Sequence, residues 1–155
     1  MIRTRFAASR PDRAEARGRI GALYQELDAA AYRGKRLRLQ ADLKTEKVVG
    51  IATIWLQVDR SRSRDVLVLD NLEARAVDGP LTGTQGWTTR HVVLDVAEEA
   101  VVVHYGFYLR GSGTAWASDF VLREAEAGEV VTKAPARLLA APRNLDFSRV
   151  ADPAS

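Results

Sequence analysis

The feature that most constrains this chain is a regular alternation of apolar and polar residues that starts at Lys35. In KRLRLQADLK the apolar side chains occupy every second position: Leu37, Leu39, Ala41 and Leu43. GIATIWLQVD repeats the pattern, with Thr53, Trp55 and Gln57 on one face and, on the other, Ala52, Ile54, Leu56 and Val58. A period of two is typical of a β-strand that places one face on a core and the other in water.

The same period recurs in the second half of the chain, in residues 87–96, 101–110 and 114–123. We expect Gly111-Ser112-Gly113 to form a hairpin turn and the Gly/Pro/Thr-rich segment 77–86 to form a loop. The apolar run DVLVLDN predicts a short strand covered on both faces. Short strands separated by turn signals indicate an all-β antiparallel sandwich or barrel.

The first third of the chain is ambiguous. In residues 19–34 the spacing of Ile20, Leu23, Tyr24 and Leu27 favours a helix, whereas Gly18 and Gly21 weaken that prediction. We expect three parts: a basic N-terminal arm at 1–17, a β-sandwich domain at 18–126, and an Ala/Pro-rich C-terminal strap at 127–155.

Composition limits the classes of function. The 155 residues include no cysteine, which removes disulfides and thiolate chemistry. No apolar run is long enough to cross a bilayer, and the N-terminus lacks the apolar centre of a signal peptide, so we expect a cytoplasmic protein without membrane partners. The net charge of +3 comes with no nucleic-acid-binding motif, so we expect no nucleic-acid partner.

Three stretches carry a resemblance to a known family: YRGKRLRLQADLKTE, LVLDNL and GWTTRHVVLDVAEEAVVVHYGFYLRGSGTAWASDF. Over residues 19–124 the chain resembles bacterial jelly-roll, galactose-binding-like domains close to carbohydrate-binding modules. Such domains occur alone or appended to transcriptional regulators. The resemblance implies a jelly roll in which RIGALYQELDA is a strand, followed by at most one helical turn at Ala29–Tyr32.

The resemblance also bears on metals. Relatives commonly carry an acidic pair after the tryptophan of the expected hairpin, whereas this chain has Ala117-Ser118-Asp119. One acid of the pair is therefore missing, and we expect neither a metal nor another cofactor. Because the two histidines, His91 and His104, lie in different strands and no nucleophile or phosphate-binding motif is present, we assign no catalytic residue.

A ligand-binding face is the more specific hypothesis. Aromatic rings stack on sugars and other flat ligands, while amide, imidazole and guanidinium groups give directional hydrogen bonds. The polar faces of the strands and the end of DVLVLDN predict a site made of Trp55, Gln57, Asn71, His104, Tyr108 and Arg110. We expect Trp87 and Trp116 in the core, with Trp116 on the same face as Phe120 and Leu122.

We therefore predict a non-catalytic domain that binds a small molecule or saccharide on a polar-aromatic sheet face. Two alternatives stay open. One is a small cyclase- or isomerase-like enzyme that shapes an apolar metabolite in a pocket. The other is an interaction module that forms a homodimer through exposed strand faces.

Overall fold

A computed structural model describes residues 6–10, by their backbone, and residues 20–133. The described chain is all-β and antiparallel, as predicted, with a single 3₁₀ turn, η1 (Ala30–Tyr32). Its strands are β1 (Phe6–Arg10), β2 (Ile20–Asp28), β3 (Arg36–Asp59), β4 (Val66–Asp70), β5 (Leu81–Asp95) and β6 (Val102–Glu124).

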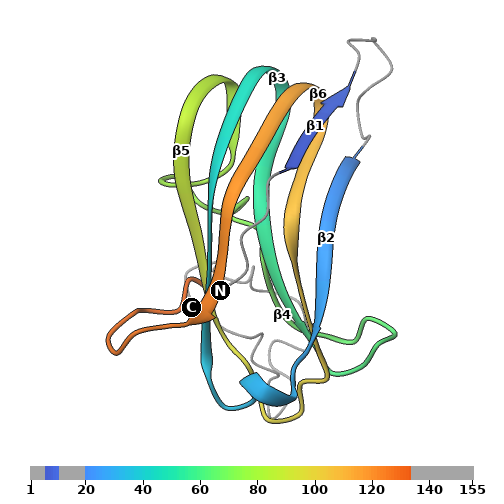
Figure 1. Cartoon of the computed structure of the whole chain (residues 1–155), viewed down its shortest axis with the longest axis vertical. Helices are drawn as coiled ribbons and strands as arrows, with labels where there is room; N and C mark the ends of the chain where they lie inside the picture. The colour runs from blue at the N-terminus through green and yellow to red at the C-terminus, as the bar shows by residue number, and fades with distance from the viewer. Residues whose placement is uncertain (1–5, 11–19, 134–155) are drawn as a thin grey trace, which may run out of the picture.

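Two long strands, β3 and β6, determine the architecture. They pair with each other along most of their lengths and bend together at one end of the molecule (Figure 1). The bend divides the sheet into a front half and a back half. The front half orders β2, residues 102–110 of β6, residues 51–59 of β3, and β4. The back half orders β1, residues 112–124 of β6, residues 36–46 of β3, and β5.

The core lies between the two halves, where the apolar faces predicted from the alternation meet. From β3, Leu37, Leu39, Ala52 and Ile54 are among the residues with no exposed surface. From β6, the inner residues include Val103, Tyr105, Phe107, Leu109, Phe120 and Leu122. Because alternate residues of each strand enter this core, the remaining side chains are left on the outer faces.

The predicted hairpin at Gly111-Ser112-Gly113 is wrong. These residues lie inside β6, where Gly111 pairs with Gly50 and Ser112 pairs with Val49 of β3. Gly50 and Gly111 have φ angles of +116° and +106°. A Cβ built on Gly111 would lie only 1.9 Å from the carbonyl oxygen of Val49. The glycines therefore let β3 and β6 turn over side by side from one half of the sheet to the other (Figure 1), and both arms of β6 pair with β3 in place of forming a hairpin.

Two further strand predictions need correction. The segment 77–86 is only partly a loop, because β5 begins at Leu81. Strand β4 is an edge strand covered on one face, and its first residue, Val66, is exposed. Its continuous apolar sequence therefore did not mean cover on both sides.

The predicted core positions of two tryptophans are also wrong. Trp87 is 55% exposed. Trp116 is half-buried on the outer face of the back half, where Lys44 Nζ lies 5.2 Å from its ring centroid. It does not share a face with Phe120, because a bulge at Asp119, with a φ angle of +53°, shifts the alternation of β6 by one residue.

The resemblance gave the right structure for the first third of the domain. Residues 20–28 form β2, in place of the helix that the apolar spacing favoured, and η1 lies inside the predicted helical turn. Within the expected arm, Phe6–Arg10 form β1, which pairs with β6. The rest of that arm and residues 134–155 of the expected strap lie outside the described residues.

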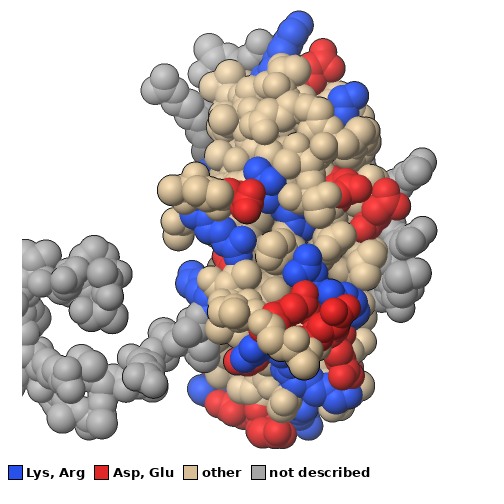
Figure 2. Space-filling model, turned by 90° about the vertical axis from the view of Figure 1, so that its left-hand side faces the viewer, with Lys and Arg blue, Asp and Glu red and all other residues tan. Residues whose placement is uncertain are grey.

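The start of the expected strap, residues 127–133, lies against the back half. Thr132 donates its backbone N–H to Val93, and Glu129 accepts hydrogen bonds from Arg38 and Arg123. The hydrogen bond from Arg123, followed by that from the backbone N–H of Glu126, and the charges of Arg123 and Arg38 lower the pKa of Glu129 to about 2. Figure 2 shows basic and acidic side chains next to one another over one face of the molecule. No helix of the described residues is long and apolar enough to span a membrane.

Candidate functional site

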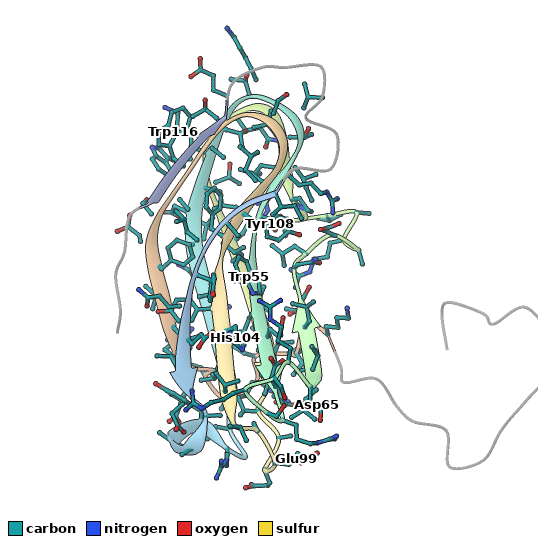
Figure 3. All side chains as sticks on the ribbon, turned by 90° about the vertical axis from the view of Figure 1, so that its right-hand side faces the viewer. Trp55, Asp65, Glu99, His104, Tyr108 and Trp116 are labelled. Atoms are coloured by element: carbon teal, nitrogen blue, oxygen red, sulfur yellow. The ribbon has the colours of Figure 1, made fainter. Side chains whose placement is uncertain are left out.

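A pocket of about 470 Å³ opens on the outer face of the front half. Strand register builds it, because Trp55 of β3 and Tyr24 of β2 both pair with Gly106 of β6. Figure 3 shows Tyr108, Trp55 and His104 following one another down this face, while Trp116 lies apart near the bend. All six residues of the predicted site line the pocket: Trp55, Gln57, Asn71, His104, Tyr108 and Arg110.

Three aromatic rings form the centre of the pocket. The Trp55 ring lies between those of Tyr108 and Tyr24, with centroid distances of 5.8 Å and 6.3 Å. The ring planes are tilted by 51° and 45°. Tyr24 is 53% exposed and Tyr108 only 9%. The rings therefore present a broad aromatic surface, of which Tyr108 is the most buried part.

Gly106 makes room for this arrangement. A Cβ built on Gly106 would lie 2.2 Å from the carbonyl oxygen of Leu23 and 2.8 Å from Cη2 of Trp55. Only a residue without a side chain therefore allows β2 to pair this closely while the Trp55 indole lies over the strand.

A network around Glu73 closes one end of the pocket. Arg110 binds the two carboxylate oxygens of Glu73 through its two terminal nitrogens, at 3.0 and 2.9 Å. The Tyr108 hydroxyl and the side-chain amide of Asn71 also donate to Glu73. Hydrogen bonding from Tyr108, followed by that from Arg110, lowers the pKa of Glu73. Burial, followed by the bond to Glu73, raises the pKa of Tyr108. The carboxylate thus stays charged and fixes the hydroxyl and guanidinium groups.

His104 lies near the other end of the pocket with two carboxylates beside it. Its Nδ1 is 3.5 Å from Oε1 of Glu26, and its Nε2 is 3.2 Å from Oδ2 of Asp59. Asp59 is fully buried and accepts hydrogen bonds from Gln57 to both its oxygens. The buried Nε2 of His104 has no hydrogen-bond partner among the described residues, although Asp59 lies 3.2 Å away.

The rest of the lining was not predicted. It comprises Ile20, Ala22, Tyr24, Arg64, Val66, Leu69 and Glu73. The alternation of β2, read as a strand, places Tyr24 with Ile20 and Ala22 on one face, so this signal was present. Glu73 and Arg64 lie in turns outside the strands, where no periodicity indicates which way a side chain points.

The described residues show no metal site. No group of three or more His, Asp or Glu side chains within 6–10 and 20–133 is placed to hold a metal ion. Asp119, the remaining acid of the pair expected from the resemblance, is exposed and accepts a hydrogen bond from Ser118.

Comparisons with known proteins agree with this fold. The chain aligns with the enzymatically active domain of tailspike protein 4 of bacteriophage CBA120 over 79% of its own length and 18% of that chain, with a TM-score of 0.50 and 9% identity. A carbohydrate-binding module of the type called CBM4 aligns over 67% of this chain and 61% of its own, with 17% identity and a TM-score of 0.44. At 9% identity the likeness to the tailspike domain concerns the fold alone. This chain is a jelly-roll domain.

The jelly-roll domain also has a relative by sequence. It is 38% identical over 132 residues to YbfP of Bacillus subtilis strain 168, an uncharacterized HTH-type transcriptional regulator. The match covers 84% of this chain but 43% of the regulator, so the chain spans less than half of that relative's length. A segment similar to this jelly roll is therefore part of a longer regulator, as the resemblance implied. No family model matches the chain.

Proposed function

We propose that this jelly roll is a non-catalytic domain that binds a ring-containing small molecule, with saccharides as the leading class. The observation that carries the proposal is the position of Trp55. Its ring lies on the outer face of the sheet and lines a pocket of about 470 Å³. That volume lies within the range of small-molecule sites. A tryptophan needed only for the core would lie between the two halves.

The distribution of polar groups supports the same proposal. The aromatic surface lies in the middle of the pocket, with the Asn71, Glu73 and Arg110 group at one end and Gln57 with His104 at the other. A sugar ring has an apolar face and a rim of hydroxyls, so it would stack on Trp55 and exchange hydrogen bonds at both ends.

The relative suggests a biological setting for the binding. Because YbfP is named an HTH-type transcriptional regulator, we propose that the jelly roll is the ligand-sensing part of such a protein and acts in the cytoplasm. In that role binding would need to change the equilibrium between two states of the regulator, and no chemical step would be required.

Replacing Trp55 tests the proposal. Thermal unfolding of the wild type with a glycan and metabolite library should identify a compound that raises the melting temperature. Trp55→Ala should lose that rise while its unliganded melting temperature stays close to that of the wild type. Trp87→Ala is the control, because Trp87 is an exposed tryptophan outside the pocket. If Trp55→Ala unfolds, or keeps the response, this ring is not the binding surface.

One observation favours a second candidate, the pocket enzyme. His104 lies beside the pocket between Glu26 and the fully buried Asp59, an arrangement that could hold or move a proton. An enzyme would convert the compound found by thermal unfolding, and His104→Asn would slow that conversion. Recovery of the compound unchanged, by mass spectrometry, would leave binding as the function. Neither test bears on the predicted homodimer. Sedimentation velocity of the protein would show whether it forms.

A further inference from the structure

The side chains that line the pocket carry more positive than negative charges. Apart from His104, the charged side chains are Glu73, Arg110 and Arg64. Glu73 and Arg110 neutralise each other through their two hydrogen bonds. Arg64 is left as a cation at the pocket without a counter-charge among its lining residues.

The turn that carries Arg64 makes the contrast clear. Arg60 lies 3.3 Å from Asp65 and 3.6 Å from Glu99, and Arg62 lies 3.8 Å from Asp28. Arg64 has no acidic partner or hydrogen bond among the residues that the structure describes. It is also the only one of the three arginines that lines the pocket.

Arg64 lies in a tight turn with an unusual backbone conformation. Its φ angle of +64° is in the left-handed region, and the turn is closed by a 2.7 Å hydrogen bond from the N–H of Arg60 to the carbonyl of Asp65. Asp65, the next residue, is labelled in Figure 3 at the lower part of the same side as Trp55 and His104. A left-handed conformation at a non-glycine residue is uncommon, and in this turn it occurs at the arginine that lines the pocket.

The other acids near this end do not neutralise Arg64. Glu26 and Asp59 both face His104, and Asp59 is fully buried and held by Gln57. Neither carboxylate is among the residues that line the pocket. A negative group that enters the pocket would therefore meet an Arg64 that no acid of the described residues pairs with.

We propose that the pocket selects a ligand in which an acidic group is attached to a ring, with the ring on Trp55 and the acid on Arg64. This proposal rests on the binding function proposed above and adds the class of ligand. A guanidinium binds planar carboxylates, and also phosphate or sulfate, through two parallel hydrogen bonds. A uronic acid is one compound that combines a sugar ring with such a group.

Matched pairs of probes test this inference. Each pair compares an acid with its neutral amide: glucuronate with glucuronamide, benzoate with benzamide, and indole-3-acetate with indole-3-acetamide. Binding at concentrations up to about 10 mM would be measured by ligand-observed NMR, which detects the weak affinities expected of such small compounds. Trp55→Ala reports whether a probe occupies the pocket. In the wild type, we expect the acid of at least one pair to bind about fivefold more tightly than its amide.

The variants Arg64→Gln and Arg62→Gln separate the role of Arg64 from general charge. Both remove one positive charge from the same turn, but only Arg64 lines the pocket. Arg64→Gln should bring the affinity for the acid down to that for the amide, while Arg62→Gln should keep the preference. Equal binding of acids and amides, or a preference that survives Arg64→Gln, would overturn this inference while leaving the binding function intact. Failure of every probe to bind at Trp55 would count against both proposals.

Discussion

The indole of Trp55 lies so close to Gly106 that a single added carbon on the glycine would come within 2.8 Å of Cη2 of the indole. The same carbon would lie 2.2 Å from the carbonyl oxygen of Leu23 on the opposite neighbour strand. One residue therefore couples two features, the pairing of β2 with β6 and the position of the central ring of the pocket.

Gly106→Ala should therefore damage both stability and binding. Either β2 or the indole has to move, and overpacking of this kind costs about 1–3 kcal/mol of unfolding free energy. Urea unfolding measures the stability, and tryptophan fluorescence reports the changed environment of Trp55. Gly86→Ala is the control, because a Cβ there meets nothing within 4 Å and the φ angle is not positive. Equal stability of the two variants would show that the close approach at Gly106 is not real.

The Glu73 network predicts a specific dependence of stability on pH. Because the pKa of Glu73 is lowered in the folded protein, its charge stabilises the fold above the pKa of the unfolded chain, which is near 4.5. That contribution disappears as the pH falls through the lower pKa of the folded state. Glu73→Gln should thus be less stable than the wild type at pH 7 by about 1 kcal/mol, and the difference should shrink to near zero in acid.

Urea unfolding of wild type and Glu73→Gln between pH 7 and acid checks this expectation. Glu46→Gln is the matched control, since the Glu46 side chain is exposed and has no hydrogen bond or ion pair among the described residues. Its stability should follow that of the wild type at every pH. If Glu73→Gln stays less stable than the wild type by the same amount in acid, the packing of the Glu73 side chain, and not its charge, stabilises the fold.

Much of the fold and of the candidate site follows from the alternation of side chains. Because side chains on a strand alternate between faces, Ile54 and Phe107 had to enter a core if Trp55 and Tyr108 pointed away from it. The structure has this arrangement, and it also brings the two rings to one pocket. The role of these rings in binding stays a prediction.

The features that were missed depend on single backbone angles. The bulge at Asp119 reverses the face of every later residue in β6, so Trp116 and Phe120 lie on opposite sides despite their even spacing. Glu73 and Arg64 lie in turns, where direction depends on local φ and ψ angles and no repeat exists to show it. The sequence alone could therefore not single out these two side chains.

The bend of β3 and β6 was missed for a different reason, and it leads to the last prediction. Gly-Ser-Gly between two alternating segments is typical of a hairpin turn, but the same residues also permit two strands to bend in close contact. Gly111 meets two constraints at once, a φ angle of +106° and a Cβ position 1.9 Å from the Val49 carbonyl oxygen. Gly83 has a positive φ angle of +68° but open space around its Cβ position.

Replacing each of these two glycines with alanine separates the effect of the positive φ angle from that of the close backbone contact. Gly83→Ala should cost only the strain of a left-handed alanine, about 1 kcal/mol. Gly111→Ala adds an overlap with backbone that cannot move without parting β3 from β6, so its cost should exceed that of Gly83→Ala by about 2 kcal/mol or more. Urea unfolding of both variants gives the comparison. A hairpin would place Gly111 in a solvent-exposed turn with no facing strand. Similar small losses of unfolding free energy at both positions would therefore contradict the continuous strand β6. They would also contradict the division of the sheet into two halves, which places Trp55 on an outer face.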